Sequence, residues 1–263
     1  MAVNLAFCLL VLVALLGPWL LEDRLAGPEP AATAAQMLGL AGAFLFFGLA
    51  LPPAARAFWG PCLVTLGFAL QFLFYQVLLG ERRGPRAALA LRTSQSGWIL
   101  LAMGLKGPWP VIGGFNLLAQ QAFVTLPLAL LLRRRGPRPR VLFLLLALAL
   151  AGCIPFSGFS AYFQIFIPLM GVKAAITSLH DKLFTEAAFL GTLVIFSLLY
   201  QTCALGYLVW REWKDGGPEG AVPGRLATGA SWACLALSLA WGLNAGRVAR
   251  GIGLLVGRLG LGF

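Results

Sequence analysis

Long apolar runs separated by short polar links dominate the pattern of this chain. Most runs approach or exceed the roughly 20 residues that a helix needs to cross a bilayer. The runs are continuous, whereas a membrane β-strand alternates between lipid-facing and interior-facing residues. The pattern therefore predicts an all-α fold, a polytopic transmembrane helical bundle that forms one domain over residues 1–263.

About eight spans are expected from the positions of these runs. In chain order they are Val3–Leu21, Met37–Ala54, Pro61–Leu79, Ala87–Leu105, Val111–Leu132, Val141–Gly171, Ala187–Trp210 and Thr228–Asn244. The sixth is ambiguous, because Pro155 cannot continue a regular helix and Gly158 follows it. One discontinuous helix, broken at Pro155–Phe159, would give eight spans, and two short crossings would give nine.

Composition and charge support a membrane location. Apolar residues make up 60% of the chain and charged residues 11%, whereas about a quarter of a soluble domain is charged. The net charge of +11 is concentrated in short links such as 81–86 and 133–140. Basic links between spans are orientation signals, which favours a membrane protein over a nucleic-acid-binding one. They predict an N-terminus outside, in a membrane that we expect to be the bacterial cytoplasmic (inner) membrane.

The sequence contains no motif of a soluble enzyme. It has no phosphate loop, dinucleotide fingerprint or nucleophile elbow. The five cysteines have no metal or redox spacing, and the single histidine, His180, excludes a clustered histidine site. We therefore predict no metal and no cofactor. An enzyme would have to use the polar link that holds His180, Asp181, Lys182 and Glu186.

Polar residues inside the spans are the remaining candidates for function. Ionisable groups at membrane depth are costly and often functional, and the candidates are Arg92, His180 and Glu186. The candidate uncharged pathway comprises Asn116, Gln120, Gln121, Tyr162 and Gln164. Positions 116 and 120 share a helix face, and position 164 follows the break. The alternative is that these residues only form interhelical hydrogen bonds.

Three segments, in this order, resemble a known family. They are Gly97-Trp98-Ile99-Leu100-Leu101, then Phe115-Asn116-Leu117-Leu118-Ala119-Gln120, then Gly152-Cys153-Ile154-Pro155-Phe156-Ser157-Gly158-Phe159. The order is similar to that in the antiporter-like membrane subunits of respiratory complex I (NADH-quinone oxidoreductase). Mrp-type cation/proton antiporters and membrane-bound hydrogenases share this fold. The resemblance covers residues 61–210 and corresponds to the later half of a longer family member.

The chain departs from the family where the family relays protons. Asn116 and Gln120 stand where histidine is common, Val124 or Thr125 where lysine is common, and Tyr162 where lysine or glutamate is common. None of these side chains titrates near neutral pH. The family fold is thus expected without the usual relay charges.

The resemblance implies an integral membrane subunit of an ion-translocating redox complex, either complex I-like or hydrogenase-like. Its expected role is structural or coupling, and its expected partners are the lipid bilayer, other hydrophobic subunits and protons or monovalent cations. A non-catalytic subunit is favoured over an enzyme. The alternatives are a self-sufficient proton or cation transporter and a membrane-embedded enzyme.

Overall fold

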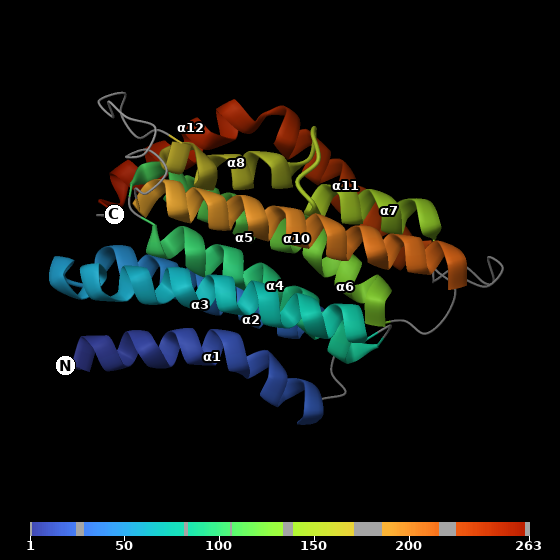
Figure 1. The fold of residues 1–263 in the computed structure, drawn as a ribbon, viewed down its shortest axis with the longest axis horizontal. Coiled ribbons are helices and arrows are strands. Elements are labelled where there is room, and N and C mark those ends of the chain that lie inside the picture. The colour runs from blue at the N-terminus through green and yellow to red at the C-terminus, as the bar shows by residue number, and fades with distance from the viewer. Residues whose placement is uncertain are drawn as a thin grey trace.

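Helices form all of the regular structure in the described part of the chain. The computed structural model describes residues 2–24, 29–81, 84–105, 107–133, 139–170, 186–215 and 225–260. The helices are α1 (Ala2–Arg24), α2 (Glu29–Leu49), α3 (Pro53–Gly80), α4 (Pro85–Gly104), α5 (Pro108–Gln120), the π-helical turn η1 (Gln121–Thr125), α6 (Leu126–Arg133), α7 (Arg140–Leu150), α8 (Ser157–Met170), α10 (Glu186–Asp215), α11 (Arg225–Leu243) and α12 (Ala245–Arg258). Most run along the long axis of the molecule, which confirms the predicted helical membrane bundle (Figure 1).

Three helical segments are long and apolar enough to cross a membrane by length and composition. They are Pro53–Gly80, Pro108–Leu132 and Phe189–Lys214, and the shorter apolar helices are Ala2–Gly17, Thr33–Leu49, Arg140–Leu150 and Thr228–Leu243. The third predicted span begins at Pro53 rather than Pro61, so that Pro61 lies inside α3. Within Pro108–Leu132, the turn η1 ends two residues before Pro127. Proline lacks the amide donor of a regular helix, which accounts for an irregular turn at this place.

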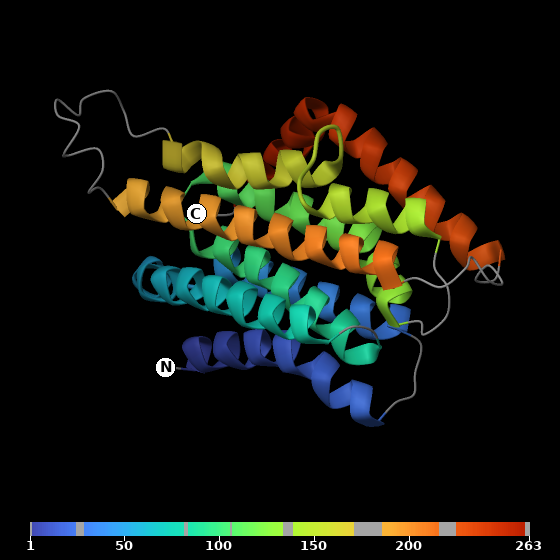
Figure 2. The same cartoon turned by 45° about the vertical axis from the view of Figure 1, so that its right-hand side comes forward.

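Helices α7 and α8 lie end to end beside the long helix α10 (Figures 1 and 2). Gln201, midway along α10, donates a hydrogen bond to the carbonyl oxygen of Leu150 at the end of α7. This arrangement is that of one discontinuous helix rather than two separate crossings. The non-helical segment is 151–156, so the predicted break is confirmed around Pro155 but starts earlier.

The glycine inside the break is Gly152, whereas the sequence predicted Gly158. Gly152 has a φ of 83°, a left-handed conformation that glycine adopts without strain. Gly158 and Phe159 belong to the first turn of α8 instead of the break itself. A Cβ at Gly158 would overlap the carbonyl oxygen of Ala149, so this glycine allows the start of α8 to approach the end of α7.

Helix α4 is the centre of the bundle. Every residue from Ala87 to Met103 is buried, and α1, α2, α3, α5, α6 and η1 all contact α4. Because protein rather than lipid surrounds it, α4 tolerates the polar stretch Arg92–Ser96. The same polarity explains why α4 is not among the helices that qualify as apolar spans.

Two reciprocal glycine contacts bring α3 and α4 together. A Cβ at Gly97 would lie 2.5 Å from the carbonyl oxygen of Gly67, and one at Gly67 would lie 2.6 Å from that of Gly97. Gly60 and Gly104 form a second pair of the same kind. Small residues let helix backbones approach closely in membranes, where packing rather than the hydrophobic effect holds helices together.

Helix ends that flank the basic links lie together at one end of the bundle. The amide of Gly84, in the turn after α3, donates to the carbonyl oxygen of Leu132 near the end of α6, over 2.9 Å. Arg211, near the end of α10, donates to the carbonyl oxygen of Leu79 over 3.1 Å. The guanidinium of Arg140 lies 6.0 Å from the ring centre of Trp213. The N-terminus lies at the opposite end (Figure 1).

We expect Gly97→Val to destabilise the protein by about 3 kcal/mol or more, since the side chain would meet a backbone oxygen that cannot rotate away. Thermal unfolding in detergent would measure the loss. The matched control is Gly42→Val in α2, where a Cβ meets no atom within 4 Å. Equal melting temperatures for the two variants would contradict the close approach of α3 and α4.

Candidate functional site

The break between α7 and α8 exposes carbonyl groups that a continuous helix would satisfy. The last carbonyl groups of any helix have no intrahelical partner. Here the carbonyl oxygen of Leu150 accepts hydrogen bonds from Gln201 Nε2 and from the Tyr162 hydroxyl at 3.1 Å. The carbonyl oxygen of Ala149 accepts a longer bond, 3.5 Å, from Gln120 Nε2. Side chains from three other helical segments therefore close the end of α7.

These contacts belong to a larger cluster, which we call the break network: Tyr75, Gln95, Trp98, Tyr162 and Gln201. Gln201 Oε1 accepts from Trp98 Nε1 at 2.7 Å and from Gln95 Nε2 at 3.3 Å. Gln201 Nε2 also donates to the Tyr162 hydroxyl at 2.8 Å. Gln95 Nε2 donates to the Tyr75 hydroxyl at 2.6 Å, and Gln95 Oε1 lies 3.1 Å from the Tyr162 hydroxyl. All five residues are buried, and they join α3, α4, α8 and α10.

A second cluster lies on the other side of α8. Asn116 Nδ2 donates to Gln164 Oε1 at 2.5 Å, and Asn116 Oδ1 accepts from Trp241 Nε1 at 3.0 Å. The Trp241 ring also makes an edge contact with Phe123, with 5.7 Å between ring centres. This cluster joins α5, α8 and α11.

Helix α11 covers the outer side of the break. The Ser238 hydroxyl lies 2.8 Å from the Ser157 hydroxyl and accepts from the Ser157 amide at 3.4 Å. A Cβ at Gly242 would overlap the carbonyl oxygens of Pro155 and Phe156. The backbone of α11 thus lies directly against the irregular segment.

A third group links α2, α4 and η1. Gln36 Nε2 donates to the Ser96 hydroxyl at 3.0 Å, and Gln121 Nε2 lies 3.5 Å from the same hydroxyl. Arg92 is only 1% exposed, and its Nη1 donates to the Thr33 hydroxyl at 2.9 Å. Arg92 is therefore held inside the bundle rather than extended to the surface.

Amides, hydroxyls and indoles make up these clusters, and Arg92 is the one charged side chain among the residues named in them. None of the others changes charge near neutral pH. Each amide presents both donors and an acceptor, so the clusters can hold a fixed geometry without ionisation. Chemically, the arrangement can hold an irregular backbone and bind polar groups, but its amides and hydroxyls cannot exchange a proton as a buried lysine or glutamate does.

The structure distributes the predicted pathway residues over these separate clusters. Asn116 donates a hydrogen bond to Gln164, and Tyr162 contacts the break. Gln120 Nε2 donates to the Ala149 carbonyl oxygen at the break, and Gln121 Nε2 donates to the Ser96 hydroxyl, each over 3.5 Å. His180 lies outside the described residues. Glu186 is the first residue of α10, but its side chain is not among those described. The proposed enzyme cluster around them therefore has no described geometry.

Five central residues were not among the predicted site residues: Tyr75, Gln95, Trp98, Gln201 and Trp241. Gln95 and Gln201 are visible in the sequence as amides inside apolar runs, but many such amides occur. The contacts of Gln201 are with residues more than one hundred positions earlier as well as with Tyr162. Only the tertiary arrangement that brings the side chains of Gln95 and Trp98 to Gln201 selects it.

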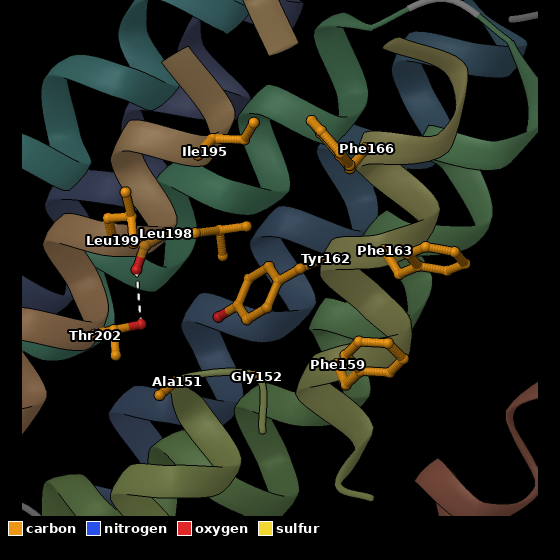
Figure 3. A pocket seen from close by; sticks show the side chains of 10 residues that line it. All are labelled: Ala151, Gly152, Phe159, Tyr162, Phe163, Phe166, Ile195, Leu198, Leu199 and Thr202. Carbon is orange, nitrogen blue, oxygen red and sulfur yellow. Dashed lines mark hydrogen bonds between the residues drawn. The ribbon is translucent and has the colours of Figure 1, made fainter. Parts of the chain in front are cut away.

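A cavity of about 240 Å³ lies beside the break, between α8 and α10. Its lining includes Gly152, Tyr162, Phe166 and Leu198, and the Tyr162 ring lies between the two helices (Figure 3). Thr202, also on the lining, uses its hydroxyl on the Leu198 carbonyl oxygen in its own helix. The lining is therefore mainly apolar, and Tyr162 belongs both to this lining and to the break network.

We expect Gln201→Leu to destabilise the protein by about 2 kcal/mol or more, because the Trp98 indole and the Leu150 carbonyl would lose a buried partner. Unfolding in detergent would measure this loss. Gln71→Leu is the matched control, since Gln71 is buried in α3 with no hydrogen-bond partner for either amide atom among the described residues. It should be neutral or stabilising. Equal losses in both variants would contradict the role given to Gln201.

Comparison with known proteins supports the fold. No protein-family model matches the sequence, and no curated protein matches it. Among solved structures, the chain is similar to one in the "Structure of Mrp complex from Dietzia sp. DQ12-45-1b", with a TM-score of 0.59 and 18% sequence identity. The match covers 98% of this chain and 66% of that chain. At this identity the likeness concerns the fold alone, and the Mrp complex is of a kind that the sequence resemblance named.

Proposed function

We propose that this chain is a membrane subunit of a multi-subunit ion-translocating complex, in which it has a structural or coupling role. The observation that carries the proposal is the uncharged break network inside an antiporter-like fold. Gln201, Gln95 and Tyr162 are each held by two or more hydrogen bonds, and together they satisfy or surround the end of α7. Their arrangement suits the maintenance of a broken helix better than proton transfer.

The physical argument concerns protonation. A proton relay needs groups whose pKa can be brought near neutral pH, such as lysine, histidine or glutamate. At the places where the family resemblance implies such groups, this chain has Asn116, Gln120 and Tyr162. All three are buried and engaged with neighbouring helices. Ion translocation by the complex would then depend on other subunits.

The finer proposal names the kind of complex. The sequence resemblance favours a complex I-like or hydrogenase-like redox complex, with other hydrophobic subunits as partners and protons or monovalent cations as the transported ions. We also propose the bacterial cytoplasmic membrane as its location, with the N-terminus outside. Support for this orientation comes from Arg140 and Arg211, which lie at the end of the bundle opposite the N-terminus.

Purification from native membranes in a mild detergent tests the proposal. We expect the tagged full-length chain to migrate on native gels far above its 28.0 kDa mass, together with other hydrophobic polypeptides. These polypeptides should include subunits with charged residues inside their spans. A chain that migrates alone under conditions that preserve other membrane complexes would contradict the proposal.

A self-sufficient transporter is the second candidate, because discontinuous helices often build transport sites at the middle of the membrane. Ion flux in proteoliposomes that contain only this chain separates the two candidates. We expect no flux above that of protein-free vesicles. Flux that falls in Arg92→Gln would favour the transporter instead, since Arg92 is a buried charge on α4.

A further inference from the structure

The end of α11 lies at the level of the helix break. Trp241 donates to Asn116, the Ser238 hydroxyl contacts that of Ser157, and Gly242 lies against Phe156. The break itself lies beside the midpoint of α10, because Gln201 bonds to Leu150. The junction between α11 and α12 is therefore near the middle of the bundle.

Helix α12 begins directly after this junction and carries arginines in its first two turns. At a rise of 1.5 Å per residue, Arg247 and Arg250 lie only about 4.5 Å and about 9 Å beyond Asn244 along the helix. Half of a hydrocarbon core of about 30 Å is about 15 Å. Even if α12 ran straight along the membrane normal, the backbone of both arginines would remain at hydrocarbon depth.

Both arginines point away from the rest of the protein. Val256 is buried, and Gly253 lies close to Ile112 of α5, so this side of α12 packs inward. Arg247 and Arg250 are exposed on other sides of the helix. Neither guanidinium forms an ion pair or a hydrogen bond with any part of the chain that the structure describes.

Large apolar side chains are exposed next to the two arginines. Leu243 and Leu254 are each 68% exposed, and Leu254 follows Arg247 and Arg250 at helical spacing on one face, with Arg258 one turn further on. An arginine at the centre of a membrane helix costs about 2.5–3.5 kcal/mol on insertion scales. Two exposed arginines at this depth therefore call for a partner of opposite charge.

We propose that this face of α12 docks another subunit of the complex, through a transmembrane segment that carries an aspartate or glutamate at the level of Arg247 and Arg250. A carboxylate would satisfy the guanidinium groups with charge-assisted hydrogen bonds. Gly246 and Gly251, which have open space at their Cβ positions, leave room for a neighbouring backbone. This inference rests on the proposed function, since it names the surface by which the chain joins its complex.

The test compares two variants of the full-length chain in native membranes. In Arg247→Gln/Arg250→Gln we expect the amount of co-purified partner per chain to fall at least about tenfold, since the partner's carboxylate would be left unpaired in the interface. Arg258→Gln is the matched control: it removes an exposed arginine at the far end of the same helix and should leave the complex intact. Chain abundance and melting temperature should not change in either variant, because these exposed side chains form no ion pair or hydrogen bond with the described residues.

A photo-reactive residue at Leu254 identifies what covers the face. We expect a cross-link to a peptide that contains an acidic residue within an apolar segment. Exchanging the charges, with Arg247→Glu/Arg250→Glu in this chain and arginine at the partner's acidic position, should restore the complex. Cross-links only to lipid or to a second copy of this chain, with the complex intact in the glutamine variant, would overturn the inference and leave the proposed function standing. A wild-type chain that migrates alone would instead overturn the proposed function.

Discussion

A helix that breaks inside a membrane protein has carbonyl and amide groups that lipid cannot satisfy, so the protein must supply their partners. In this chain the carbonyl groups of Ala149 and Leu150 are in that position, and Gln120, Tyr162 and Gln201 meet them. The rest of the bundle follows from this requirement. Helices α4, α5, α8 and α10 must all approach the break closely enough for short amide side chains to reach it.

Close packing around α4 makes this approach possible. The glycine pairs between α3 and α4 bring the two backbones together, and this places Tyr75 of α3 within reach of Gln95 of α4. Gly158 and Gly242 do the same for α8 and α11 at the break itself. Small residues thus bring the helix backbones together. Amide side chains then satisfy the polar groups that this close approach leaves inside the bundle.

The sequence was sufficient to predict the helical class, most span positions and the existence of a break near Pro155, because these depend on local properties: hydrophobic runs and the missing amide of proline. It also selected Asn116 and Gln164 as candidates, but not the hydrogen bond between them. It could not select Gln95 and Gln201 from the other buried amides, because their roles arise from contacts between helices far apart in the chain. Gln71 illustrates the difficulty, since it has the same character and the same burial but no partner among the described residues.

The uncharged character of the break network has a consequence for how the protein responds to membrane potential. Moving one elementary charge across the membrane is worth about 2.3 kcal/mol per 100 mV. A network of amides, hydroxyls and indoles carries no net charge, so the field does almost no work when these side chains rearrange. The break network should therefore keep the same structure in energised and de-energised membranes, and any voltage-dependent step of the complex must occur where charges move.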